Sequence, residues 1–384
     1  MILAAARVVT PAQVLEPGWL LVDGDRVVEV GHGQPPRPAD TDLGAATVVP
    51  GFVDLHVHGG GGASFDTGTV EAAEVAIATH LARGTTSMAA SLVTDSPDNT
   101  AAAVRGLAPL VGDGRLAGIH LEGPWLSPRR AGAHRTDLLS HPDPASVEEV
   151  LAAGDPSTGS GRRGAVRMVT LAPELPGGID AVRRLADAGV LVAIGHTDAT
   201  YDEARAAIDA GARLGTHLFN AMRPLHHRDP GAVGALLDAP VDVELVADGV
   251  HLHPAVLRTV FAAKPGRCIL VTDATAAAGG PDGEHRLGPM AIVVRDGVAR
   301  LADGSRDGVI AGSTLTMDAA VRFAVRTAGL PLRDVVHAAS TAPAAAWGLA
   351  DVGAIEAGRR ADLVVLDDHL EVVGVMRAGA WGRH

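Results

Sequence analysis

The sequence predicts an α/β fold of the (β/α)8 type: a closed TIM-type barrel of eight parallel strands surrounded by helices, with a small β-sandwich domain formed by both chain termini. Three observations predict it. Short apolar runs alternate with Ala-rich helical stretches through the middle of the chain, eight such strands can be counted, and short strands broken by turns occupy both ends. Eight repeats of this kind favour a closed barrel over an open doubly wound sheet.

Composition agrees with a large, well-packed core. The chain has 384 residues, of which 47% are hydrophobic, 20% charged and 3% aromatic, so its core must consist mainly of Val, Leu, Ile and Ala. The net charge of −13 argues against a nucleic-acid partner, although a local cationic pocket could still bind a small anion. No apolar run approaches 18 residues and no basic leader precedes an apolar stretch, so we expect a cytoplasmic protein that contacts no membrane.

The domains follow from this pattern. Residues 1–50 are expected to form the first part of the β-sandwich, residues 51–347 the barrel, and residues 348–384 the second part of the sandwich. The terminal strands are expected at Gly18–Val22, Arg26–Val30, Asp362–Leu366 and Glu371–Met376.

Within the barrel, each expected strand is a short apolar run. The eight strands are expected at Gly51–Val57, Thr86–Leu92, Leu116–Leu121, Val166–Leu171, Val190–Gly195, Leu214–Phe219, Val243–Ala247 and Cys268–Thr272. The helices between them include Thr69–Arg83, Ile179–Ala188 and Asp202–Ala210. Two segments interrupt the pattern: Gly154–Gly164 has the composition of a mobile loop, and Pro289–Leu301 is expected to be a hairpin inserted after strand eight.

Residues that can bind a metal ion stand at the ends of five of these strands. In such barrels the chemistry takes place at the carboxyl ends of the strands. A single histidine in an apolar run is more often a hydrogen-bonded core residue than a ligand, but here several residues converge. They are His56 and His58 at the end of strand one, Glu122 after strand three, His196 after strand five, His217 in strand six and Asp273 after strand eight.

The spacing and charge of these six residues favour a divalent metal site. His56 and His58 are two residues apart, so both imidazoles lie on one face of the strand and can point at one ion. Glu122 and Asp273 end apolar strands, where a carboxylate is costly to bury unless a cation accompanies it. His120 shares the inward parity of Glu122 and is expected to support the site or belong to the core.

Seven motifs carry a resemblance that covers nearly the whole chain. They are Pro50–His58 (PGFVDLHVH), His120–Pro124 (HLEGP), Gly195–Thr200 (GHTDAT), Thr216–Met222 (THLFNAM), Ala247–His251 (ADGVH), Val271–Thr275 (VTDAT) and Ile310–Ser313 (IAGS). In these motifs the chain resembles the amidohydrolase superfamily and, within it, the enzymes that deacetylate N-acetylglucosamine 6-phosphate. The first motif indicates only the superfamily, whereas the second and fourth together are much more specific.

The resemblance implies a metal-dependent hydrolase with one or two divalent ions. It implies that Glu122, His196 and His217 bind the principal ion. Retention of His56 and His58 leaves room for a second ion that Glu122 would bridge, with Asp273 among the ligands. Zinc is expected, although such ligands also accept Fe, Mn or Co. Lys264, the only lysine, precedes strand eight, which excludes the subtypes whose metals are bridged by a carboxylated lysine ending strand four.

The resemblance also implies a set of substrate contacts. Asn220 and Ala221 would contact the sugar phosphate, His251 the sugar, and His134 the scissile carbonyl. Arg228 would reach the phosphate in the neighbouring subunit's site, which makes the protein a homodimer; a solvated surface arginine is the alternative reading. The full substrate set is Ala133, His134, Asn220, Ala221, Arg228, His251, Ile310, Ala311 and Gly312.

The implied reaction is hydrolysis of the acetamide of N-acetyl-D-glucosamine 6-phosphate to acetate and D-glucosamine 6-phosphate, in amino-sugar catabolism or cell-wall recycling. Asp273 is placed to take a proton from water and to deliver it to the departing amine, and His134 to stabilise the oxyanion. Two alternatives remain at this stage. One is another amidohydrolase, such as a D-aminoacylase or a nucleobase deaminase. The other is a non-catalytic sugar-phosphate binding protein, although binding alone has no use for Asp273.

Overall fold

The barrel predicted from the sequence is present. The computed structural model describes residues 1–153, 164–302, 304, 306 and 308–382. Eight parallel strands form one sheet in the order β8, β11, β12, β13, β14, β15, β16, β17. Their bounds are Phe52–Asp54, Thr85–Val93, Gly118–Glu122, Val166–Leu171, Leu191–Ile194, Leu214–Gly215, Asp242–Val246 and Cys268–Val271. The (β/α)8 fold class is therefore confirmed.

The ring closes where the last strand meets the first. The Asp273 amide donates to the His56 carbonyl and the His58 amide donates to the Ala274 carbonyl, both at 2.8 Å. One residue earlier, the Thr272 hydroxyl donates to the buried carboxylate of Asp54 at 2.7 Å. These bonds lie at the carboxyl ends of β8 and β17, so the residues that close the barrel are those next to the expected site.

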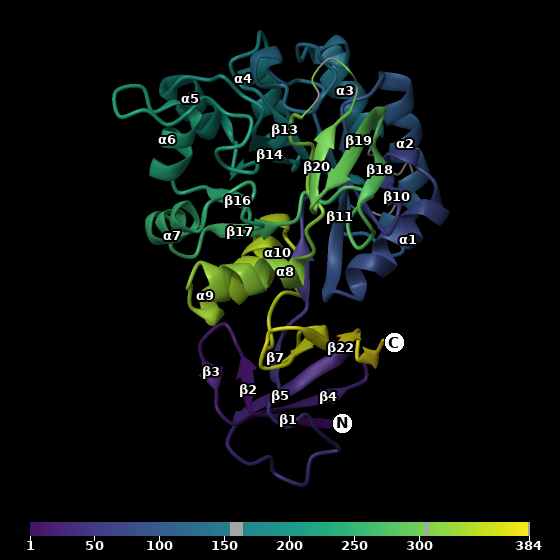
Figure 1. Ribbon diagram of the computed structural model, residues 1–384, viewed down its shortest axis with the longest axis vertical. Helices are drawn as coiled ribbons and strands as arrows, with labels where there is room; N and C mark the ends of the chain where they lie inside the picture. Colours follow the sequence, from purple (N-terminus) through teal and green to yellow (C-terminus); the bar gives the residue numbers. More distant parts are fainter. Residues whose placement is uncertain (154–163, 303, 305, 307, 383–384) are drawn as a thin grey trace.

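Helices cover the outside of the barrel (Figure 1). They are α1 Val70–Leu81, α2 Pro97–Gly112, α3 Pro144–Ala153, α4 Gly178–Asp187, α5 Tyr201–Ala210, α6 Gly231–Asp238, α7 Pro254–Ala263, α8 Met317–Arg322, α9 Leu332–Val336 and α10 Ala342–Trp347. Side-chain caps fix several of their starts. Thr200, for example, forms a reciprocal capping box with Glu203, which satisfies otherwise unpaired amides and begins α5 at Tyr201. Among the described residues, none of the helices combines the length and apolarity needed to cross a membrane.

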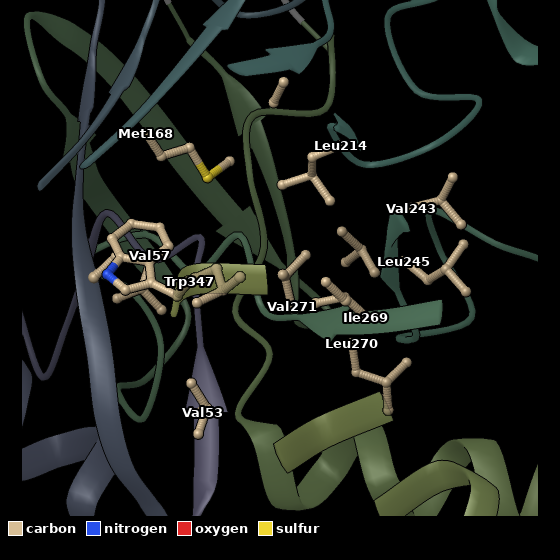
Figure 2. Packing of buried hydrophobic residues seen from close by; sticks show 14 of the residues in the cluster. Val53, Val57, Met168, Leu214, Val243, Leu245, Ile269, Leu270, Val271 and Trp347 are labelled. Atoms are coloured by element: carbon tan, nitrogen blue, oxygen red, sulfur yellow. The ribbon is translucent and has the colours of Figure 1, made fainter. Parts of the chain in front are cut away.

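Aliphatic side chains fill the space around the strands (Figure 2). Val243 and Leu245 of β16 are fully buried, as are Ile269 and Val271 of β17. Side chains alternate across a strand, so Val243 and Leu245 point away from the face that carries Glu244. The barrel wall is thus apolar on its helix side, which leaves the inner face of the strand ends for polar residues.

A separate β-domain combines both ends of the chain, and the purple and yellow segments lie side by side in Figure 1. One sheet contains β1 Ile2–Ala5, β4 Gly18–Asp23, β5 Arg26–His32 and β6 Thr41–Asp42. The other contains β2 Arg7–Val9, β3 Val14–Leu15, β7 Thr47–Pro50, β21 Leu363–Leu366, β22 Val372–Arg377 and β23 Ala380–Trp381. The sheets share one apolar cluster, and β7 pairs with β21 across the two termini. The boundaries at residues 50 and 347 remain predictions.

The structure differs from the expected elements in several places. Strand one, expected to end at Val57, ends at Asp54. The inserted hairpin is part of a three-stranded sheet of β18 Gly283–Leu287, β19 Met290–Arg295 and β20 Val298–Leu301. The sequence did not indicate β18, because three of its five residues are polar or charged. Strand six ends at Gly215, because His217 and Phe219 have φ values of 28° and 78° that leave the extended conformation. A short hairpin of β9 Gly59–Gly60 and β10 Ala63–Ser64 was not expected. The loop predicted at Gly154–Gly164 lies, except for its last residue, outside the described residues.

The packing of β16 predicts a stability effect without a functional one. Leu245→Ala removes a fully buried side chain and should destabilise the fold by about 2–5 kcal/mol, because the cavity it leaves cannot collapse completely. Val75→Ala, at a position 45% exposed on α1, is the matched control and should change stability by less than about 0.5 kcal/mol. Thermal unfolding of both variants measures this, and equal Tm values would contradict the packing described.

Candidate metal centre and active site

A cavity of about 260 Å³ opens at the carboxyl ends of the barrel strands. Glu122, His196, His217 and Asp273 form its polar wall. Leu287 and Met290, from the inserted sheet, form an apolar wall. This volume lies just below the usual range of ligand pockets, about 300–1,000 Å³. The cavity can therefore hold only one small molecule.

A larger cavity, about 560 Å³, lies at the amino ends of the strands, between α7, α9 and the β-domain. Its lining includes Arg258, Cys268 and His337. In the part of the chain that the structure describes, the convergent metal-ligating groups all lie elsewhere, at the other end of the barrel. Burial raises the pKa of the Cys268 thiol to about 12, which makes it inert at neutral pH. We therefore assign the chemistry to the smaller cavity.

Two groups of three residues converge in that cavity. One contains His56, His58 and Asp273, and the other contains Glu122, His196 and His217; within each group the ligand atoms lie within 4.8 Å of one another. These are the six residues predicted as metal ligands, so the structure brings all of them together.

Glu122 lies between the two groups. Its Oε1 atom is 3.1 Å from His196 Nε2 and 3.2 Å from His217 Nε2. The same carboxylate reaches the other group, with Oε2 3.4 Å from His58 Nε2. Lys264 is remote from this centre, because its Nζ donates to the main-chain carbonyls of Leu236 and Ala239. Glu122 is thus the anionic group that both clusters share.

The donor set fits a divalent cation. The Nε2 atoms of His56 and His58 are 3.1 Å apart, and those of His196 and His217 are also 3.1 Å apart. Nitrogen lone pairs that face each other this closely in a buried site suit coordination to a cation, and imidazole with carboxylate is a common set for zinc and for other first-row metals. The residues therefore supply a divalent-metal site.

Protons and a cation would compete for these atoms. Burial lowers the pKa of His58, but hydrogen bonds with Asp273 and Glu122 outweigh that effect and raise the pKa to about 9. Burial raises the pKa of Glu122, yet the nearby His56 and His134 hold it well below its usual value. A metal ion must displace the imidazole protons, so metal affinity should fall as the pH falls.

A chain of hydrogen bonds inside the barrel supports the site. Ser91 Oγ lies 2.9 Å from His120 Nδ1, and His120 Nε2 lies 2.8 Å from Thr170 Oγ1, which in turn lies 2.8 Å from Thr216 Oγ1. The His120 ring packs edge-on against His56, with centroids 4.6 Å apart. Burial lowers the pKa of His120 well below its usual value, which keeps the ring neutral. His120 thus supports the centre, as the sequence indicated.

Three of the six converging residues have a left-handed backbone. The φ angles are 47° at His196, 28° at His217 and 50° at Asp273. Each such conformation costs about 1–3 kcal/mol in a residue other than glycine and persists only when the surroundings hold it. The Ser127 amide donates to the His196 carbonyl at 2.9 Å, and the Ser313 amide donates to the Asp273 carbonyl at 2.7 Å. The strained turns aim these side chains into the cavity.

Sequence reasoning missed four residues around this centre. Asp54 accepts hydrogen bonds at the barrel closure, and burial raises its pKa to about 7. The Thr94 hydroxyl donates a hydrogen bond to the Glu122 carbonyl at 3.0 Å, and the Thr94 amide donates one to His134 Nδ1 at 3.3 Å.

Two further residues contact the site from other segments. Arg306 donates a hydrogen bond to the His134 carbonyl at 2.7 Å. Glu244 contacts His56 from β16. Only the two acidic residues carried a sequence signal, namely a carboxylate inside an apolar strand.

Most of the predicted substrate residues line the cavity. Those that do are Ala133, His134, Asn220, Ala221, His251, Ile310 and Gly312. His134 Nε2 is 3.2 Å from Glu122 Oε2. Ala311 is fully buried next to them and does not line the cavity. Arg228 lies outside the cavity on an exposed loop, where its Nη1 atom is 2.9 Å from His227 Nε2.

Comparison with known proteins agrees with this geometry. A model of the amidohydrolase family matches residues 47–382. The N-acetylglucosamine-6-phosphate deacetylase of Lysinibacillus sphaericus is 37% identical over 86% of this chain and 84% of that protein. The N-acetylgalactosamine-6-phosphate deacetylase of Escherichia coli O157:H7 is 36% identical over 97% of this chain and 96% of that protein.

A solved structure is also similar over the whole barrel and β-domain. It is a mutant N-acetyl-D-glucosamine-6-phosphate deacetylase from Mycobacterium smegmatis in complex with N-acetyl-D-glucosamine-6-phosphate. It has a TM-score of 0.94 at 51% identity and covers 99% of this chain and 98% of that chain. The chain therefore belongs to the amidohydrolase family and, within it, to the group of N-acetylglucosamine-6-phosphate deacetylases.

The buried donor set predicts that metal removal destabilises the protein. Dialysis against a chelator should lower Tm, because an ion at 1,000 times its dissociation constant stabilises the native state by about 4 kcal/mol. Adding back Zn²⁺ or Co²⁺ should restore Tm. An unchanged Tm in a sample that metal analysis shows to be metal-free would contradict a cation-dependent centre.

Proposed function

We propose that the protein hydrolyses the acetamide of N-acetyl-D-glucosamine 6-phosphate to D-glucosamine 6-phosphate and acetate. The observation that carries the proposal is the convergence of two groups of candidate metal ligands, which include Glu122 and Asp273, with His134 in one cavity. The similarity to deacetylases over nearly the full chain supports it.

In this proposal the two groups hold one or two divalent ions. Glu122, His196 and His217 form the tighter site, and His56, His58 and Asp273 form a weaker one that Glu122 bridges. Zinc fits these ligands best, although Fe, Mn or Co also suit them. A bound ion would polarise the amide carbonyl and lower the pKa of water to about 7.

Asp273 and His134 perform the proton transfer and charge stabilisation. Asp273 takes a proton from the attacking water and delivers it to the amine, which cannot leave as an anion. His134 donates from Nε2 to the carbonyl oxygen as negative charge develops there. Glu122 supports this assignment, because its Oε2 lies 3.2 Å from His134 Nε2 and an ionised carboxylate can only accept, which favours the tautomer with hydrogen on Nε2.

The remaining predicted residues bind the sugar phosphate. Asn220 and Ala221 contact the phosphate end, and His251 contacts the sugar. Asp248 Oδ2 lies 2.7 Å from His251 Nδ1, so the carboxylate orients that ring. Ala133 and the main chain of Ile310 and Gly312 complete the contacts, whereas Ala311 is buried behind them. Arg228 reaches the phosphate bound by the other subunit of a homodimer.

An acetate-release assay tests the proposed function. The metal-loaded protein should release acetate from N-acetylglucosamine 6-phosphate and little from unphosphorylated N-acetylglucosamine. N-acetylgalactosamine 6-phosphate belongs in the same assay, because one close relative bears that activity in its name. Equal rates on the phosphorylated and plain sugars, or activity only on N-acylated D-amino acids or nucleobases, would instead indicate another amidohydrolase.

The first functional prediction concerns Asp273. Asp273→Asn should lower kcat by roughly 10²–10⁴-fold with KM little changed, because the amide cannot accept the proton from water. Metal content should be measured in the same preparation, since Asp273 also faces His58 at 3.2 Å. Near-normal turnover in a metal-loaded variant would remove Asp273 from the mechanism.

The second functional prediction concerns Arg228. Arg228→Ala should raise KM for the 6-phosphate roughly 10- to 100-fold, the loss of a charge-assisted contact of ~1.5–3 kcal/mol, and should change the rate on the plain sugar little. Arg183→Ala, at another exposed arginine on α4, is the matched control and should leave KM unchanged.

Mixed dimers test whether Arg228 acts across subunits. A subunit with Arg228→Ala combined with a subunit with Asp273→Asn would generate one pocket that has both groups intact, so activity should partly recover. If subunit exchange is verified and activity does not recover, Arg228 does not serve the neighbouring site.

A further inference from the structure

Glu244 is a buried carboxylate that the proposed mechanism leaves without a role. It lies on β16, it is 0% exposed, and its side chain points into the barrel beneath the two metal-ligating groups. It follows Val243 and precedes Leu245, both packed on the helix side of the same strand. An acidic residue in this setting is costly unless its surroundings compensate the charge.

A single oxygen of Glu244 contacts one residue from each metal-ligating group. Oε2 is 3.1 Å from Nδ1 of His56 and accepts a hydrogen bond from the main-chain amide of His217 at 3.2 Å. His56 belongs to the group with His58 and Asp273, whereas His217 belongs to the group with Glu122 and His196. Glu244 is therefore a physical link between the two groups.

The contact with His56 determines which ring nitrogen is available. An ionised carboxylate can only accept a hydrogen bond. Nδ1 of His56 therefore carries a proton and donates a hydrogen bond to Glu244. Nε2 is then the nitrogen that can give up its proton, and it is the one that faces His58 Nε2 at 3.1 Å. A carboxylate in this position also makes the imidazole a stronger donor to a cation.

The contact with His217 supports a strained backbone. His217 has a φ of 28°, and its amide points at Glu244 rather than into a strand ladder. Without that acceptor, the buried His217 amide would have no hydrogen-bond partner among the described residues. The left-handed turn that aims His217 at Glu122 thus depends on the same oxygen that orients His56.

A space-filling role does not explain this carboxylate. Its other oxygen, Oε1, is buried and has no hydrogen-bond partner among the residues that the structure describes. A leucine would fill the same volume without that cost. The carboxylate is compensated only if positive charge lies close by, as it would with cations bound to His56 and His217.

We propose that Glu244 is a positioning residue that holds His56 in the orientation needed for the second metal ion and keeps the two ligand groups in register. This inference rests on the metal assignment in the proposed function. It concerns a residue that touches neither substrate nor metal, and it predicts an effect on metal binding itself.

Cobalt binding to the full-length protein tests the role of Glu244. Co²⁺ affinity is measured by competition with a chelator, and the visible absorption of bound Co²⁺ reports coordination geometry. Glu244→Leu should weaken the second ion roughly 10- to 100-fold and change the spectrum, the usual effect of losing a group that orients a ligand. Glu244→Gln should lose less, because its amide oxygen can still accept both hydrogen bonds. Asp242→Asn, which removes a carboxylate that faces Arg267 at the other end of β16, is the matched control and should bind as wild type does.

Glu244→Asp keeps the charge but draws it one bond away from His56, so it should also weaken the second ion. If circular dichroism shows that Glu244→Leu does not fold, Glu244→Asp is the variant that tests the role of Glu244. A folded Leu variant, or the Asp variant in its place, that binds the second Co²⁺ with wild-type affinity and an unchanged spectrum overturns the proposal.

The double variant His56→Ala with His58→Ala distinguishes a failure of the Glu244 proposal from a failure of the metal assignment on which it rests. It should reduce bound Co²⁺ from about two ions to about one, as expected from the two ligand groups. An unchanged count in the double variant overturns the metal assignment. A reduced count in the double variant, with no effect from Glu244→Leu or Glu244→Asp, overturns only the role of Glu244.

Discussion

The structure depends on one buried anion, the carboxylate of Glu122. Imidazole nitrogens from five positions lie within 3.5 Å of its oxygens, contributed by His56, His58, His134, His196 and His217. Apart from the pair His56 and His58, these residues are far apart in sequence, and the closed ring of strands brings them to one point. A carboxylate buried in this way is stable only with cationic partners, which links the fold to metal binding.

The barrel also stabilises conformations that an isolated loop would not hold. His196, His217 and Asp273 have left-handed backbones, and each forms a hydrogen bond with another segment, with Ser127, Glu244 and Ser313 respectively. Their side chains therefore need little rearrangement to receive an ion. The apolar packing on the helix side of the strands stabilises the ring that carries these three turns.

The fold and the convergence of the six candidate ligands could be predicted from sequence because they depend on local patterns. Apolar runs mark the strands, and the residue that ends each strand falls at the catalytic edge of the barrel, as it does for Glu122 and Asp273. Three features could not be predicted because they depend on three-dimensional contacts. Thr94 and Arg306 meet the loop of His134 only in the folded chain, and the role of Glu244 depends on its register relative to β8. The place of Arg228 in a dimer remains a prediction, because one subunit cannot show it.

Glu122 contacts both ligand groups, and we infer that its carboxylate joins them into a single metal centre. Anomalous diffraction at the cobalt edge, on crystals grown with excess Co²⁺, measures this directly. We expect two anomalous peaks in the cavity, one beside His196 and His217 and one beside His56 and His58, with the Glu122 carboxylate in contact with both. Peaks located elsewhere, or a carboxylate of Glu122 that contacts neither ion, would contradict it.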